Sequence, residues 1–155
     1  MSQPNILYIH SHDTGRYIQP YGHAVATPCL QRLAEQGVLF RQNFCINPTC
    51  SASRASLLTG SYPHENGMTG LAHRGFALND YHQHIVHTMR KNGYLTVLAG
   101  AQHEAAPTPT QKPWQIIGYD RYLEAPQFEQ ASAFLESAPK TPFFLSVGFS
   151  ETHRE

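Results

Sequence analysis

The sequence lacks an excess of charge of either sign. Eleven lysine and arginine residues balance eleven acidic residues among 155, and the sequence pI is about 7.2. Proteins that hold nucleic acid or an anionic membrane through bulk charge carry an excess of basic residues. We therefore expect no nucleic-acid partner and no membrane partner, and a small or local ligand instead.

Long apolar runs and paired cysteines are also missing. No stretch reaches the length of a transmembrane helix, and no apolar run that could act as a secretory signal precedes Asn5. As given, the sequence predicts a cytoplasmic protein, or a periplasmic or secreted one if a signal has been removed. Cys29, Cys45 and Cys50 are odd in number and lack the spacing of a disulfide framework or a zinc finger. We expect all three to be thiols.

Histidine is abundant: there are ten, almost as many as lysine and arginine together. Because histidine is the commonest metal ligand and a proton shuttle at neutral pH, each one has to be placed individually. A chain of this length fits one domain over residues 1–155 and buries roughly 70% of the surface that it exposes when unfolded. The sequence is therefore long enough to form a core.

Short apolar runs alternate with segments of helical spacing. We predict strands over residues 5–9, 38–44, 94–99 and 142–149. We predict helices over residues 28–36, 50–59, 81–92 and 126–138, with His82, His84 and His87 on the solvated side of the third. The alternation indicates an α/β fold: a largely parallel sheet with helices on both faces.

The spacing around Cys50 implies chemistry. Pro48 ends the preceding segment, and the helix predicted after it carries Cys50 and Arg54 in its first turn. A helix N-terminus favours an anion through its unpaired N–H groups and its dipole, and Arg54 adds a fixed positive charge. The segment therefore indicates a site that handles an oxyanion.

Polar side chains also follow the other predicted strands. His12 and Asp13 come after the first strand, His103 after the third and His153 after the fourth. Since the carboxyl ends of parallel strands lie at one edge of a sheet, these residues and Cys50 are expected to meet there.

Several motifs of the sequence resemble those of a known protein family. The segment Cys-Ser-Ala-Ser-Arg-Ala-Ser-Leu-Leu-Thr-Gly begins at Cys50, Pro-His-Glu-Asn-Gly-Met follows at Pro63, and a Gly-x-x-His loop ends at His103. With the Pro-Phe-Phe-Leu strand before His153, they resemble the N-terminal part of sulfatases of the alkaline phosphatase-like superfamily. The likeness is greatest to heparan N-sulfatases and bacterial arylsulfatase-type members.

The resemblance implies that a separate maturation enzyme, which reads Cys-x-Ala-x-Arg, oxidises Cys50 to formylglycine. The hydrated aldehyde would be the nucleophile toward a sulfate ester or sulfamate, expected to be that of a carbohydrate or oligosaccharide. Arg54 would hold the hydrate, His103 would handle its proton, and His153 and His64 would contact the substrate.

The resemblance also implies a divalent metal, calcium in the family, bound by Asp13, His12 and the converted Cys50. The family usually has two aspartates where this sequence has His12 and Asp13. Because calcium prefers oxygen ligands, an imidazole there either favours a transition metal such as manganese or zinc or leaves the shell to Asp13 alone. A family lysine is also replaced, by Ala101, so we expect weaker sulfate binding or a substitute group from elsewhere.

Relatives of this family run to several hundred residues, and part of their metal shell and a sulfate-binding lysine lie beyond the position of Glu155. The sequence is therefore expected to be the N-terminal part of a larger catalytic domain, with little sulfatase activity alone. Two alternatives stay open: a phosphoryl hydrolase of the same superfamily, and a truncated relative without catalytic activity.

Overall fold

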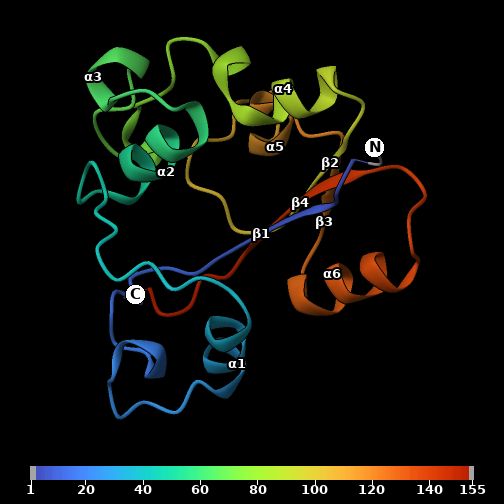
Figure 1. Cartoon of the computed structure of the whole chain (residues 1–155). Helices are drawn as coiled ribbons and strands as arrows, with labels where there is room; N and C mark the ends of the chain where they lie inside the picture. Colours follow the sequence, from blue (N-terminus) through green and yellow to red (C-terminus); the bar gives the residue numbers. More distant parts are fainter. Residues whose placement is uncertain (1–2, 154–155) are drawn as a thin grey trace.

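The sheet is parallel and has four strands. The computed structural model describes residues 3–153, and its strands are β1 (Ile6–His10), β2 (Leu95–Gly100), β3 (Arg121–Leu123) and β4 (Phe143–Gly148). Their order is β1-β4-β2-β3, and every neighbouring pair is parallel. The strands run from the side marked N toward the side where α2 lies (Figure 1). The predicted parallel sheet is confirmed.

Helices cover both faces of the sheet, as predicted. They are α1 (Pro28–Gln36), α2 (Cys50–Thr59), α3 (Pro63–Asn66), α4 (Ile85–Lys91), α5 (Pro113–Ile117) and α6 (Gln127–Glu136). Short 3-10 turns are η1 (Gln19–Tyr21), η2 (Ala72–Arg74) and η3 (Tyr81–Gln83). α4 and α5 lie on one side of the sheet and α6 on the other (Figure 1). Within residues 3–153, no helix has the length and apolar character needed to cross a membrane.

The core has one layer on each face of the sheet, because successive side chains of a strand point to opposite faces. The layer under α6 contains Val97, Leu145, Val147, Ala131 and Phe134. The layer under α4 and α5 contains Leu98, Phe144, Val86 and Ile117. The two layers fix β2 and β4 at the centre, so the loops after these strands start from rigid positions.

Two leucines on the face of the sheet that carries α6 are expected to differ in how much they stabilise the fold. Leu7 of edge strand β1 is in register with Leu145 of β4, but Leu7 is 45% exposed and Leu145 is fully buried. We expect Leu145→Ala to lower the free energy of unfolding by about 3 kcal/mol, because it leaves a cavity. The matched Leu7→Ala should cost about 1 kcal/mol or less. Urea denaturation measures both free energies of unfolding. Equal losses would contradict the difference in burial between Leu145 and Leu7.

The predicted strand over residues 38–44 is wrong. This segment is irregular, and Val38, Phe40 and Phe44 are 77%, 69% and 84% exposed. An apolar run becomes a strand only where its backbone groups pair with those of another strand, and no strand among the described residues pairs with this segment. Cys50 therefore reaches the site from an irregular segment, and only three of the four site segments follow strands.

The predicted helix over residues 81–92 is divided. η3 ends at Gln83, His84 is extended, and α4 begins at Ile85. His84 is fully buried, so its predicted place on the solvated side is wrong. Its Nδ1 accepts a hydrogen bond from the Val86 amide and caps the helix. Residues 114–122, whose mixed sequence predicts no regular element, form most of α5 and the short strand β3.

The buried His84 makes stability depend on pH. Burial lowers the pKa of His84 from 6.5 to about 3, so the folded protein keeps it neutral while the unfolded chain protonates it below about pH 6.5. Its contribution is therefore complete above pH 6.5 and declines as the pH falls toward 3.

We expect the urea midpoint to drop between pH 7 and pH 5, and His84→Asn to reduce that drop while keeping a helix cap. His82→Asn, at an exposed position two residues earlier, is the control. An unchanged pH dependence in His84→Asn would refute this role of His84.

Candidate functional site

Cys50 lies at the first position of α2, where packing fixes the direction of the helix. Ser51, Ala52 and Ala55 are buried, and Ser51 Oγ accepts a hydrogen bond of 3.1 Å from the amide of Ala72. These contacts hold the buried side of α2 against the segment that follows α3. The half-buried Cys50 is thereby fixed at the edge of the sheet, as its sequence position predicted.

The Cys50 thiol faces a neutral histidine. Cys50 Sγ and His103 Nδ1 are 3.4 Å apart, within hydrogen-bonding distance for sulfur. Burial, with smaller contributions from His12 and Arg54, lowers the pKa of His103 from 6.5 to about 4. His103 is therefore neutral at pH 7 and able to accept a proton from a group at position 50.

The loop after β2 holds His103 in place. Gly100 has a φ of +79°, and a Cβ there would lie 2.3 Å from the carbonyl oxygen of Gly148, so the chain turns where only glycine fits. Gln102 Oε1 accepts hydrogen bonds from the amides of Glu104 and Ala105. Glu104 is buried, which raises its pKa, and its Oε2 accepts a 3.3 Å bond from the His103 amide. The imidazole thus projects from a rigid turn.

Arg54 is bound to the end of β1. Its Nη2 donates to the carbonyl oxygen of Ser11 at 2.9 Å, and its Nη1 donates to His10 Nδ1. Burial, and then the Arg54 charge, lower the pKa of His10 to about 3, so this nitrogen stays an acceptor. The other ring nitrogen of His10 is 3.5 Å from Ser146 Oγ.

His10 is the first residue of the His-x-His-Asp cluster that follows the first predicted strand, but no role was predicted for it. One signal was available: the period of two along β1 places His10 on the same face as Tyr8, and the two rings stack at 4.9 Å. A histidine on the inward face at the end of a strand has to find a polar partner, and here the partner is Arg54.

Three histidine rings gather beside this pair. The His12 ring lies 4.2 Å from that of His103 and 5.2 Å from that of His153. Backbone bonds bring the segments together, since the amide of His12 donates to Glu151 and the amide of Thr152 donates to His12. His12, His103 and His153 therefore meet at one edge, as predicted.

The His12 side chain is unusual within this cluster. It is 1% exposed, and neither ring nitrogen has a hydrogen-bond partner among the described residues. Burial, and then the charge of Arg54, lower its pKa. A buried, neutral imidazole without partners has the donor chemistry of a metal ligand.

The full metal site predicted from the sequence is not formed by this part of the chain. Asp13, next to His12, is exposed and has a left-handed φ of 51°. Across residues 3–153, no group of three or more His, Cys, Asp or Glu side chains is arranged to hold a metal ion. Asp13, His12 and Cys50 thus do not complete a metal shell here, and their metal role stays a prediction.

Comparison with known proteins decides the family. The sequence model of the family described as Sulfatase matches residues 4–155. The chain belongs to the sulfatase family. It is 31% identical to N-sulphoglucosamine sulphohydrolase from Homo sapiens over 97% of this chain and 32% of that protein. It is 29% identical to an ulvan-active sulfatase from Formosa agariphila over 97% of this chain and 25% of that protein.

The fold is also that of solved structures. A protein in complex with its substrate D-glucosamine-2-N,6-O-disulfate superimposes with a TM-score of 0.80 at 24% identity, over 99% of this chain and 35% of that chain. The chain thus spans about a third or less of the length of these relatives. The resemblance to sulfatases and the alkaline phosphatase-like α/β fold are both confirmed.

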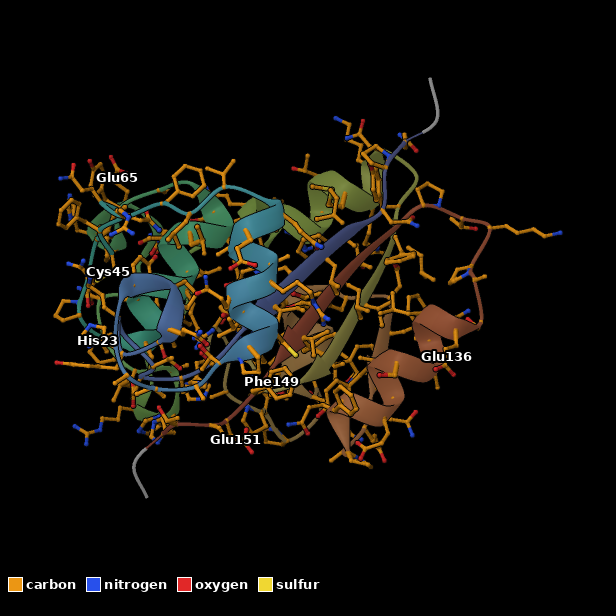
Figure 2. The ribbon with its side chains drawn as sticks, turned by 60° about the horizontal axis from the view of Figure 1, so that its bottom comes forward. His23, Cys45, Glu65, Glu136, Phe149 and Glu151 are labelled. Carbon is orange, nitrogen blue, oxygen red and sulfur yellow. The ribbon has the colours of Figure 1, made fainter. Side chains whose placement is uncertain are left out.

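One residue of the sulfatase resemblance lies apart from the others. His64 is on α3, is exposed, and stacks on Tyr62 with ring centroids 5.9 Å apart. Within residues 3–153, no hydrogen bond or ring contact joins it to Cys50 or His103. Figure 2 shows its neighbour Glu65 on the side of the molecule where α2 and α3 lie, away from Glu136 on α6. Its role toward substrate stays a prediction.

Proposed function

We propose that this chain forms the nucleophile-bearing part of a sulfatase that hydrolyses a sulfate ester or sulfamate of a carbohydrate. The contact of Cys50 Sγ with the neutral imidazole of His103, at 3.4 Å, is the observation that carries the proposal. Family membership supports the reaction class, and relatives named for sulfated sugars support the substrate class. One is N-acetylgalactosamine-6-sulfatase from Homo sapiens, 31% identical over 91% of this chain and 29% of that protein.

The proposal includes conversion of Cys50 to formylglycine by a separate maturation enzyme. One oxygen of the hydrated formylglycine aldehyde acts as the nucleophile. The aldehyde re-forms when sulfate leaves. The surroundings fit this group, because a hydroxyl in place of the thiol would meet a neutral imidazole and lie at a helix N-terminus.

The residues of this chain have separate tasks in the proposal. His103 Nδ1 accepts a proton from the group at position 50. Arg54, fixed by His10 and Ser11, supplies a positive charge that stabilises the developing oxyanion. His153 contacts the sulfate or the leaving group from the same edge.

A divalent metal belongs to the proposal as well, with calcium as the family's metal. Asp13 and His12 would contribute part of its shell, and the imidazole of His12 suits manganese or zinc better than calcium. Because the described residues do not complete a shell, none of the steps above depends on the metal.

Expression together with a formylglycine-generating maturation enzyme tests the proposal. We expect mass spectrometry of the peptide containing Cys50 to find the thiol converted to an aldehyde, with Cys45 unchanged as the internal control. A thiol that stays unconverted would contradict the proposal. Turnover of aryl sulfate and aryl phosphate should then be compared in a protein that contains this sequence and the rest of the family domain. A large preference for phosphate would favour a phosphoryl hydrolase.

A further inference from the structure

A pocket opens beside the loop that carries His103. It has a volume of about 330 Å³ and lies at the carboxyl ends of β2 and β3. Its lining residues are Leu98, Gly100, Ala101, Gln102, Lys112, Pro113, Trp114 and Tyr122. The set contains one cation and no carboxylate. None of the roles described above uses this pocket.

The pocket adjoins the site. A smaller cavity of about 160 Å³ is lined by Ser51 and His103, the neighbours of Cys50 in sequence and in space. Gln102 and Pro113 line both hollows, so the two share a wall. The larger pocket therefore lies beside the cavity next to Cys50, where a further unit of a chain-like ligand has room.

The walls of the pocket suit a sugar ring. Trp114 and Tyr122 are half-buried and their rings stack on each other, with an interplanar angle of 9° and centroids 6.4 Å apart, and the remaining exposed ring surface lines the pocket. Such flat apolar surfaces stack against the C–H face of a sugar, while their polar edges stay available for hydrogen bonds. Ala101, which also lines the pocket, ends at Cβ and leaves its volume open.

Lys112 supplies the charge. Its side chain is 68% exposed, and its ammonium lies 4.0 Å from Glu124 Oε1, the outer limit of an ion pair. An exposed pair of this length contributes little stability, so the ammonium can turn to a ligand anion without loss. Lys112 therefore places a positive charge in the wall of this pocket.

We propose that the pocket of Lys112, Trp114 and Tyr122 binds a second, sulfated sugar unit of the substrate. The aromatic rings hold the sugar, and the Lys112 ammonium binds its sulfate group. This inference rests on the proposed function, which it deepens by assigning an oligosaccharide with sulfate on adjacent units as the substrate class.

Tryptophan fluorescence offers a direct test, because Trp114 is the single tryptophan of the chain. The probes are a glucosamine disaccharide sulfated on both sugars, the same disaccharide without sulfate, and inorganic sulfate. We expect a saturable fluorescence change with the sulfated disaccharide and little with the other two. Lys112→Ala should weaken its binding by about two- to fivefold, the range of one exposed charge contact.

Lys112→Ala leaves the core intact, whereas replacement of Trp114 would disturb the packing under α5. The matched control is Lys140→Ala, an exposed lysine that precedes β4 at the opposite end of the sheet, and its affinity should be unchanged. Equal weakening by both variants, or an equal response to inorganic sulfate or to the unsulfated sugar, would overturn the proposal.

The two proposals can fail separately. If Cys50 is converted and aryl sulfate is hydrolysed while Trp114 fluorescence does not respond, the second-sugar pocket is refuted and the sulfatase function stands. If the sulfated disaccharide binds in a Lys112-dependent way while Cys50 stays a thiol, the pocket stands and the proposed catalytic function is refuted.

Discussion

Replacement of Cys50 with alanine is expected to abolish sulfate ester hydrolysis, with a loss in kcat of more than about 10⁴-fold. The variant has no group at position 50 that a maturation enzyme could convert. His103 would then face a methyl group in place of the group with which it forms a hydrogen bond. The measurement is aryl sulfate turnover by a protein that contains this sequence and the rest of the family domain, produced with the maturation enzyme.

The matched control is Cys45→Ala. Cys45 is exposed and lies five positions before Cys50, so its replacement should change neither the activity nor the melting temperature. Cys50→Ala should also keep the wild-type melting temperature to within a few degrees, because the thiol is only half-buried. Activity that survives in the folded Cys50→Ala variant would rule out Cys50 as the precursor of the nucleophile.

The second large effect is expected for Arg54→Lys, with a fall in kcat/KM of about 10²- to 10³-fold, the usual cost of one lost oxyanion donor. The guanidinium donates to His10 and to the Ser11 carbonyl at the same time. A lysine keeps the charge but has one ammonium on a flexible stem, so it cannot be held by both acceptors in a fixed plane. The positive charge would then no longer be fixed relative to position 50.

The effect of Arg54→Lys has to be separated from a failure of maturation, because Arg54 belongs to the Cys-x-Ala-x-Arg pattern that the proposed maturation enzyme would read. Mass spectrometry therefore gives the converted fraction, and kcat/KM is expressed per converted site. Arg74→Lys, at an exposed arginine of η2, should have wild-type activity. If the converted Arg54→Lys protein matches the wild type, the geometry set by His10 has no catalytic role.

The elements that the sequence predicted well are those with strong local signals. Thr27 and Pro28 mark the start of α1 and Gly37 its end, and the structure has a helix over Pro28–Gln36. The apolar run ending in Gly148 is fully buried as β4, the central strand that pairs with both β1 and β2. Such runs need only a buried position, which the centre of a parallel sheet provides.

The elements that were mispredicted depend on partners far along the chain. Val38 and Phe40 have strand-like composition, but no strand among the described residues pairs with their segment. β3 has three residues, too few for a periodic signal, and forms because Leu98 and its neighbours offer a backbone edge. In both cases the available edge, and not the local composition, decided the result.

For this protein, the sequence by itself determined the family, through its motifs, and also the helix that carries Cys50 and Arg54 and the edge at which His12, His103 and His153 gather. The helix and the edge follow from local spacing and from the rule that parallel strands end together. Only the tertiary structure decided that His103 is the partner of Cys50 and that His10 holds Arg54. Their charge states and distances come from burial and from contacts between segments more than 40 residues apart, which no local pattern encodes.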